Sequence, residues 1–378
     1  MDGRADYPSV HNTSPSTPGR HRRVRAAALV ASLLVVTTAC GGEDSASVPV
    51  TPAPAPPPVT AAPTAYPLTI DNCGRKITFD RAPSRVVLLN GTSVAEVESF
   101  IALGIDDRVL ANSQSYGVSD DPAMADKVSA VPTGGLTLNQ NYEVPREQVF
   151  ALKPDLVIST WAGGFDEKIG SASRDQLAAA GINTFVTPSN CAFGDPAPRP
   201  EDEARYRAQS VESSTELLVQ LGQIFDVQQR AVDQVTRTRG RLAEVARRIS
   251  GKQTKSVLVV YPGMAVMNNN GLPAVFGGGV YDDIIAKAGG TNPFAGRSTA
   301  ELAEINAEAL AAARVDVLVI GVFQATENAE LFAGDLFAKF PQWEASRTRT
   351  FTSVSDSVYL GPLNAVAVEK IADAAHGA

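Results

Sequence analysis

The chain has 378 residues, a length that suits two domains of ordinary size. It carries 33 Lys and Arg against 41 Asp and Glu, which gives a net charge of -8. The sequence contains no basic stripe that could follow a nucleic-acid backbone, so we expect no nucleic-acid partner.

The first 39 residues have the pattern of a signal peptide. An arginine-rich segment at 20–25 is followed by an apolar run at 26–36 that is too short to span a bilayer permanently. The run ends in Thr37-Thr38-Ala39-Cys40, which resembles the bacterial lipobox, although Thr37 stands where Leu is usual. We expect cleavage before Cys40, lipidation of Cys40, and anchoring on the extracytoplasmic face of the cell membrane. Cleavage near Ala39 with an unmodified cysteine is the alternative.

Residues 40–67 are expected to form the lipidated Cys and a Pro-rich tether. The segment is rich in Pro, Ala, Ser and Thr and has too little apolar surface to offset its ordering entropy. If Cys40 carries lipid, Cys73 and Cys191 remain as an even pair in an oxidising compartment. We expect a disulfide between them, and two separate thiols are the alternative.

From residue 68 onward, short apolar strands alternate with helices, a pattern typical of a mostly parallel α/β sheet. In the first half, strands are expected at 76–79, 85–89, 155–159 and 182–186, and helices at 93–103, 145–152 and 175–180. In the second half, strands are expected at 256–260, 316–320 and 350–354, and helices at 281–288, 300–313 and 364–375.

The middle of the chain predicts a long helix. Apolar residues recur at helical spacing over 227–248, with Arg, Gln and Asp between them. Such a helix would be about 33 Å long. We expect a first α/β lobe over 68–222, an inter-lobe helix over 223–250, and a second α/β lobe over 251–378.

Each half also contains a similar helix-strand unit. Glu147 opens the first unit and Asp155 begins its strand eight residues later, and Glu308 and Asp316 repeat that spacing. The equal spacing favours two related lobes, although short units of this kind also resemble each other by chance.

Several motifs, read together, resemble a known family. They are Asp71-Asn72-Cys73-Gly74-Arg75, an Arg-Val-Val strand start at 85–87, Leu-Lys-Pro-Asp-Leu-Val-Ile at 152–158, and Gly-Gly-Thr-Asn at 289–292. In this order they resemble the ABC-transporter solute-binding proteins of the helical-backbone class, which handle ferric siderophores, haem and cobalamin and include the ferric-dicitrate-binding periplasmic proteins. The resemblance implies two lobes with mostly parallel sheets, joined by one long, rigid backbone helix, with the ligand cleft between the lobes.

The resemblance also implies one docking carboxylate per lobe, facing arginines on an ABC permease. These positions correspond to Glu147 and Glu308. A Glu in the first turn of a helix is also favoured by the helix dipole alone, so helix-start chemistry is the alternative. We expect a monomer.

Histidine is nearly absent from the folded part. His11 and His21 fall in the signal peptide and His376 is third from the end. This disfavours a Ser-His-Asp triad, a His-rich metal site and haem held by an axial His, while a Tyr ligand to haem stays open. We expect no enzymatic activity, no protein metal site and no intrinsic cofactor, although the sequence leaves a carboxylate-only hydrolase open.

Ligand-binding residues are expected on loops that follow strands, where α/β folds open their clefts. The expected residues are Asn90, Thr92, Ser93, Tyr116, Trp161, Gly163 and Phe193 in the first lobe, and Tyr261, Met264, Asn269, Arg297, Phe323 and Tyr359 in the second. Trp161 stands where the family often places an aromatic over its ligand, and a packing role is its alternative. We expect a ferric siderophore as the ligand. The alternatives are haem, a corrinoid, or a cell-envelope scaffold that has lost transport.

Overall fold

The computed structural model describes residues 61–89, 94–114 and 118–377. Residues 59–378 form one compact unit, and its described residues contain every element discussed below. Within these described ranges, no helix combines the length and the apolar character that crossing a membrane requires.

The first lobe is built on a four-stranded parallel sheet with the order β4-β3-β5-β6. Its strands are β3 (Val86–Leu88), β4 (Val109–Asn112), β5 (Leu156–Ser159) and β6 (Asn183–Val186). An antiparallel hairpin of β1 (Leu68–Asn72) and β2 (Arg75–Phe79) precedes the sheet. Every residue of β3 and β5 is buried, which explains their unbroken apolar runs. The accompanying helices are α1 (Ala95–Leu103), α2 (Pro122–Ala130), α3 (Arg146–Leu152), α4 (Arg174–Ala179), α5 (Pro200–Arg207) and α6 (Val211–Ile224).

The second lobe is built on a five-stranded sheet with the order β11-β10-β7-β8, and β9 also pairs with β7. Its strands are β7 (Lys255–Tyr261), β8 (Ala274–Phe276), β9 (Gly290–Thr291), β10 (Val317–Val322) and β11 (Phe351–Ser355). Only β8 runs antiparallel to its neighbour among the described strands of this sheet. The accompanying helices are α8 (Gly279–Lys287), α9 (Thr299–Ala303), α10 (Ala307–Ala312), α11 (Ala329–Lys339), α12 (Glu344–Thr348) and α13 (Asn364–His376).

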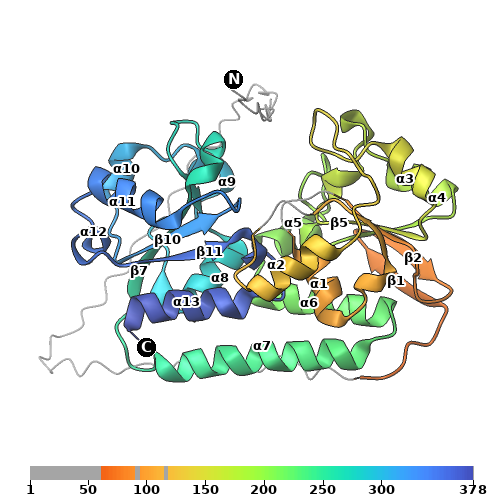
Figure 1. Cartoon of the computed structure of the whole chain (residues 1–378), viewed down its shortest axis with the longest axis horizontal. Coiled ribbons are helices and arrows are strands. Elements are labelled where there is room, and N and C mark those ends of the chain that lie inside the picture. The colour runs from red at the N-terminus through yellow and green to blue at the C-terminus, as the bar shows by residue number, and fades with distance from the viewer. Residues whose placement is uncertain (1–60, 90–93, 115–117, 378) are drawn as a thin grey trace, which may run out of the picture. The chain divides into compact units, whose positions relative to one another are not determined.

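One long helix, α7 (Gln228–Arg248), runs along both lobes (Figure 1). Its 21 residues correspond to about 32 Å. Arg239 of α7 pairs with Glu212 of α6 at 2.9 Å, and Arg248 pairs with Asp373 of α13 at 2.8 Å. The helix is therefore fixed to helices of both lobes, and the expected α/β fold with a long backbone helix is confirmed.

The structure confirms one helix expectation and corrects another. The long helix predicted over 227–248 is confirmed as α7, and Asp226, with a positive φ of 56°, interrupts the helical path between α6 and α7. The single helix expected at 300–313 is wrong: α9 and α10 replace it. Asn306 starts α10 by accepting a hydrogen bond from the Ala309 amide at 2.8 Å.

A buried carboxylate joins the two lobes away from α7. Asp120 Oδ2 accepts hydrogen bonds from the Ser355 amide at 2.9 Å and from the Ser355 hydroxyl at 3.1 Å. Its Oδ1 accepts from the Lys370 ammonium at 2.8 Å. The Asp120 side chain is only 6% exposed, so this ion pair contributes to holding β11 and α13 against the first lobe.

Candidate functional site

The carboxyl ends of three strands in the first lobe meet at one buried carboxylate, Glu96 of α1. Thr160 follows β5 and donates its hydroxyl to Glu96 Oε2 at 2.7 Å. Gln114, which follows β4, donates its amide to the same oxygen at 3.0 Å, and Thr187, which follows β6, donates to Oε1. Burial raises the pKa of Glu96. The network fixes the three loops at the edge of the sheet where α/β folds place ligands.

Asn190 connects this edge to the second lobe. Its amide donates to the Thr160 carbonyl at 2.8 Å, and its Oδ1 accepts from Gln209 Nε2 at 2.6 Å. The Tyr359 hydroxyl, on the chain after β11, donates to the same Oδ1 at 3.1 Å. Burial raises the pKa of the Tyr359 phenol, so this hydroxyl stays protonated and acts as a donor.

Two groups of aromatic side chains flank the Asn190–Tyr359 contact. In the first lobe Trp161 and Phe193 lie 5.1 Å apart between ring centroids, and Phe193 stacks on Tyr206 at 5.7 Å. We call these three residues the first aromatic set. In the second lobe, ring contacts at 5.1 and 6.2 Å link the residues of the second aromatic set, which are Phe276, Tyr281 and Tyr359.

Close backbone approach places the Trp161 ring. A methyl group at Gly163 would lie 2.3 Å from this ring, and one at Gly194 would lie 2.5 Å from it, so both positions require glycine. The Gly163 amide also donates to the Phe193 carbonyl at 3.2 Å, which ties the loop after β5 to the loop after β6. Gly163 itself is buried and supports the tryptophan.

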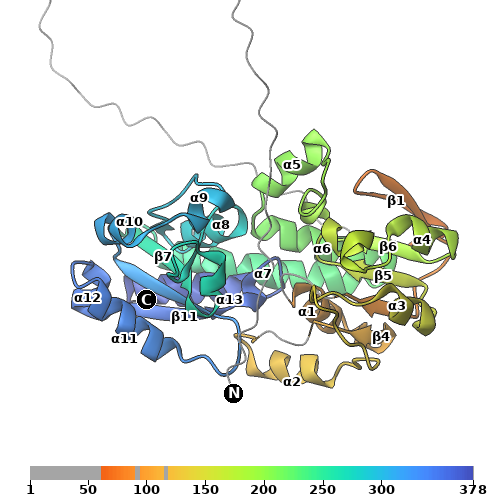
Figure 2. The same ribbon diagram turned by 90° about the horizontal axis from the view of Figure 1, so that it is seen from above.

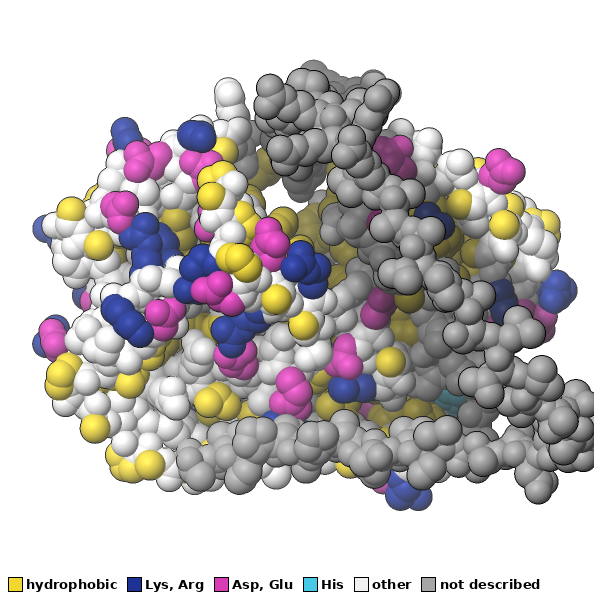
Figure 3. All heavy atoms as spheres, turned by 180° about the vertical axis from the view of Figure 1, so that it is seen from behind, with side chains coloured by type: hydrophobic (Ala, Val, Ile, Leu, Met, Phe, Trp, Pro, Cys, Tyr) yellow, Lys and Arg dark blue, Asp and Glu magenta, His cyan; other side chains and the backbone are white. Residues whose placement is uncertain are grey.

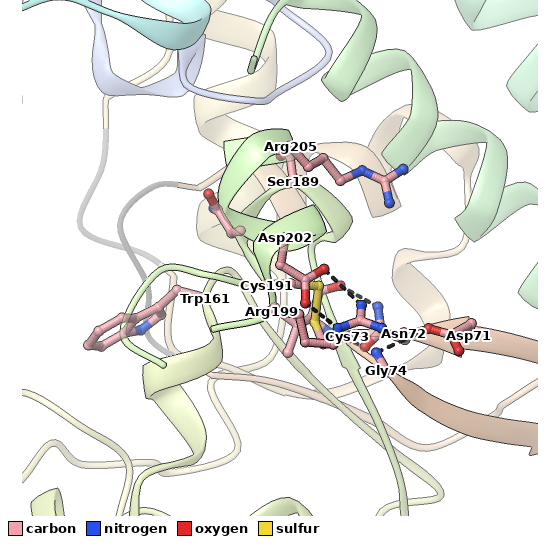
Figure 4. The surroundings of a disulfide bond; sticks show 12 residues. Asp71, Asn72, Cys73, Gly74, Trp161, Ser189, Cys191, Arg199, Asp202 and Arg205 are labelled. Atoms are coloured by element: carbon pink, nitrogen blue, oxygen red, sulfur yellow. Dashed lines mark hydrogen bonds and ion pairs between the residues drawn. A yellow bond between two sulfur atoms is a disulfide. The ribbon is translucent and has the colours of Figure 1, made fainter. Parts of the chain in front are cut away.

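The disulfide between Cys73 and Cys191 also stabilises this region (Figure 4). It joins the β1–β2 turn to the loop that carries Phe193, across a sequence separation of 118 residues. Arg199 lies against the same turn and pairs with Asp202 through two hydrogen bonds of 2.6 and 2.8 Å. The bridge agrees with the sequence prediction and holds the loop from which Asn190 and Phe193 extend.

Tyr261, a predicted ligand residue, lies in the core of the second lobe. Its side chain is fully buried, and its ring lies over Gly321, where a methyl group would come within 2.3 Å. It packs against Phe276 at 4.6 Å between centroids and so supports the second aromatic set from the core side.

Arg297, another predicted ligand residue, lies away from the aromatic sets. It is exposed, lies over the Phe294 ring at 5.3 Å, and lines a cavity of about 590 Å³ together with Ser256 and Arg314. Ser256 and Arg314 stand at the amino ends of β7 and β10, whereas Tyr359 follows the carboxyl end of β11. Arg297 is therefore at the opposite edge of the sheet from the aromatic residues.

The remaining predicted ligand residues divide into three groups. Met264 and Phe323 are half-buried and pack against the core of the second lobe. Asn269 is exposed, and its backbone N–H donates at 2.9 Å to the carbonyl of Ala303, the last residue of α9. The residues that lie outside the described part are Asn90, Thr92, Ser93, Tyr116 and the expected lipidation site Cys40.

The two predicted docking carboxylates begin short helices. Glu147 lies in the first turn of α3 with 71% of its side chain exposed, and Arg146 donates to it at 2.8 Å, which lowers the pKa of Glu147. Glu308 is exposed in the first turn of α10. Figure 1 shows α3 and α10 on the side of the two sheets away from α7, and Figure 2 shows them far apart, one in each lobe. From behind, Lys and Arg side chains are interspersed with Asp and Glu (Figure 3).

Sequence patterns did not identify several residues of the site, among them Glu96, Tyr206, Gln209 and Tyr281. Glu96 reads as an ordinary acidic residue in a first helical turn. Tyr206 and Gln209 stand in a polar segment where no periodicity marks them. Among the described residues, no group of three or more His, Cys, Asp and Glu is placed to hold a metal ion.

The sequence matches one known protein family. Residues 91–345 match a family described as periplasmic binding protein. A search of curated protein sequences finds no match.

Solved structures share the fold. An ABC-type Fe3+-hydroxamate transport protein from Saccharomonospora viridis is similar with a TM-score of 0.57 and 24% identity, over 82% of this chain and 99% of that one. A periplasmic binding protein from Veillonella parvula gives a TM-score of 0.62 and 18% identity, over 82% and 98%. A periplasmic heme binding protein from Pseudomonas aeruginosa gives 0.56 and 20%, over 78% and 94%. The family match and this shared two-lobe fold together show that the chain belongs to the periplasmic binding protein family.

Proposed function

We propose that this protein captures a ferric siderophore between its two lobes and delivers it to an ABC permease. The observation that carries the proposal is the pair of aromatic sets, one from each lobe, that meet at the Asn190–Tyr359 hydrogen bond. Large aromatic surfaces with a few placed polar groups suit a bulky, partly apolar ligand.

The iron in such a ligand is already coordinated by the organic chelator. The protein then needs ring surface and hydrogen-bonding groups, and no metal ligands of its own. Asn190 and Gln209 supply amide groups beside the aromatic sets. Similar solved structures include one named for Fe3+-hydroxamate transport, which supports this ligand class.

Haem is the second candidate, because other similar structures are named as heme-binding proteins. A tyrosine that holds haem iron binds it through the phenolate oxygen. Burial raises the pKa of both Tyr206 and Tyr359, which favours the protonated phenol in each case. Coordination of haem iron by either tyrosine would require loss of this proton, and at Tyr359 also loss of the hydrogen bond to Asn190.

Delivery requires a membrane location and a docking face. In this proposal residues 1–39 are removed, Cys40 carries the lipid anchor, and residues 40–67 serve as the tether. The body then consists of lobes over 68–222 and 251–378 with the inter-lobe helix between them, and it acts as a monomer on the extracytoplasmic face. Glu147 and Glu308 meet arginines of the permease, so that charge pairing sets orientation.

Tryptophan fluorescence tests the ligand assignment. The chain has two tryptophans: Trp161 is half-buried in the first aromatic set, whereas Trp343 is 1% exposed and donates to the Leu310 carbonyl at 2.8 Å. A ferric trihydroxamate should quench the wild type and Trp343→Phe, and should leave Trp161→Phe almost unchanged. Stronger quenching by haem or cobalamin would reassign the ligand. No response to any of the three would favour the scaffold alternative.

A further inference from the structure

Large hydrophobic side chains are exposed at only four positions among the described residues. They are Leu138 at 41%, Val266 at 57%, Met267 at 49% and Leu331 at 67% exposure. Single exposed hydrophobic residues are ordinary on protein surfaces, so their placement matters more than their number. Three of the four, Leu138, Val266 and Met267, lie on segments that are hydrogen-bonded to residues near Glu147 or Glu308 in the chain.

In the first lobe, Leu138 directly follows Thr137, which is hydrogen-bonded to Gln148 of α3. The Thr137 amide donates to Gln148 Oε1 at 2.9 Å, and Gln148 Nε2 donates to the Thr137 hydroxyl at 2.8 Å and to its carbonyl at 3.3 Å. Gln148 directly follows Glu147. These hydrogen bonds therefore fix the segment that carries the exposed Leu138 against α3, the helix whose first turn carries Glu147.

In the second lobe, Val266 and Met267 directly precede the three asparagines at 268–270. Two of these asparagines are hydrogen-bonded to the segment before α10. Asn268 Nδ2 donates to the Ile305 carbonyl at 3.0 Å, and Asn270 Nδ2 donates to the Glu304 carbonyl at 3.1 Å. This segment leads directly into the first turn of α10, which carries Glu308. Amide hydrogen bonds thus fix a hydrophobic segment beside the helix start that bears the carboxylate, as in the first lobe.

We propose that Leu138 and the Val266-Met267 pair are the apolar contacts of the permease-docking surface, one beside each docking carboxylate. The inference rests on the proposed delivery to an ABC permease. Exposed ion pairs give orientation and association rate but little affinity, because water and salt screen them. Interfaces obtain most of their affinity from a few buried hydrophobic anchors surrounded by polar groups. The partner is therefore a permease surface with apolar side chains next to its arginines.

Site-specific photo-crosslinking in cells that express the full-length chain tests this surface. p-Benzoylphenylalanine replaces Leu138, Met267 or Leu331 in separate variants. Leu331 is the matched control, because it is the most exposed of the four and lies on α11, with no described hydrogen bond to α3 or α10. We expect positions 138 and 267 to crosslink to the multi-pass subunits of an ABC permease, identified by mass spectrometry, at least tenfold more than position 331.

Two further variants separate this inference from the proposed function. The photoreactive residue is also placed at position 147 and at position 308. Crosslinks to the permease from 147 and 308 with none from 138 and 267 would overturn the apolar contacts and leave carboxylate docking intact. Absence of permease crosslinks from all four positions would instead refute docking itself. Crosslinks from 138 and 267 to a second copy of this chain would also overturn the inference.

Discussion

Asp120 provides a quantitative test of how the two lobes are held together. Its buried carboxylate accepts hydrogen bonds from Ser355 and Lys370, which lie 235 and 250 residues later in the chain. Removing one partner of a buried ion pair costs about 3–5 kcal/mol when the other charge stays buried. The Lys370 side chain is 33% exposed and its ammonium regains some water, so we expect Asp120→Ala to lower the free energy of unfolding by about 2–3 kcal/mol.

Urea denaturation of the wild type, Asp120→Ala, Lys370→Ala and the double variant measures this coupling directly. The cycle should give an interaction energy of at least about 1 kcal/mol, because the two residues share one buried contact. Asp126→Ala is the control, since Asp126 is exposed on α2 and should change stability by less than about 0.5 kcal/mol. If Asp120→Ala costs no more than this control, the carboxylate does not hold the lobes together.

Three further predictions concern stability and anchoring. Replacing Cys73 and Cys191 by Ala should lower the free energy of unfolding by about 2–5 kcal/mol, because the bridge closes a loop of 118 residues; an unchanged urea midpoint would argue against this account. Burial raises the pKa of Glu143 to about 8, so the folded state retains a proton that the unfolded state releases. Stability relative to Glu143→Gln should therefore be complete below about pH 4.5 and decline, by on the order of 5 kcal/mol at most, as the pH rises through about 8. Parallel pH profiles of the two proteins would contradict this. Cys40→Ala should leave the protein in the soluble rather than the membrane fraction of cells, and membrane partitioning of this variant equal to that of wild type would show that Cys40 carries no anchor.

Apolar runs made much of the fold predictable from the sequence. The strands β3, β5, β7 and β10 are almost entirely buried, and such strands appear as continuous runs of Val, Leu and Ile. The same burial accounts for the position of Tyr261. At the end of a strand covered on both faces, a tyrosine can pack into the core as readily as it can face a ligand.

The polar part of the site depends on contacts that sequence spacing does not record. Glu96 meets Thr160 and Thr187 across 64 and 91 residues, and only the parallel order of the strands brings them together. Tyr206 becomes part of the first aromatic set through its stacking on Phe193. Arg297 was expected near the ligand from its residue type alone, and chain topology places it at the far edge of the sheet.

Native mass spectrometry of the purified protein with an equimolar ferric trihydroxamate tests the central claim most directly. The account predicts a one-to-one complex that retains both the chelator and its iron. Alanine at Tyr359 should weaken this complex at least tenfold, because the variant removes a ring and a hydroxyl at the junction of the lobes. A protein that takes up free iron without the chelator, or that binds the chelate equally well without Tyr359, would contradict the account.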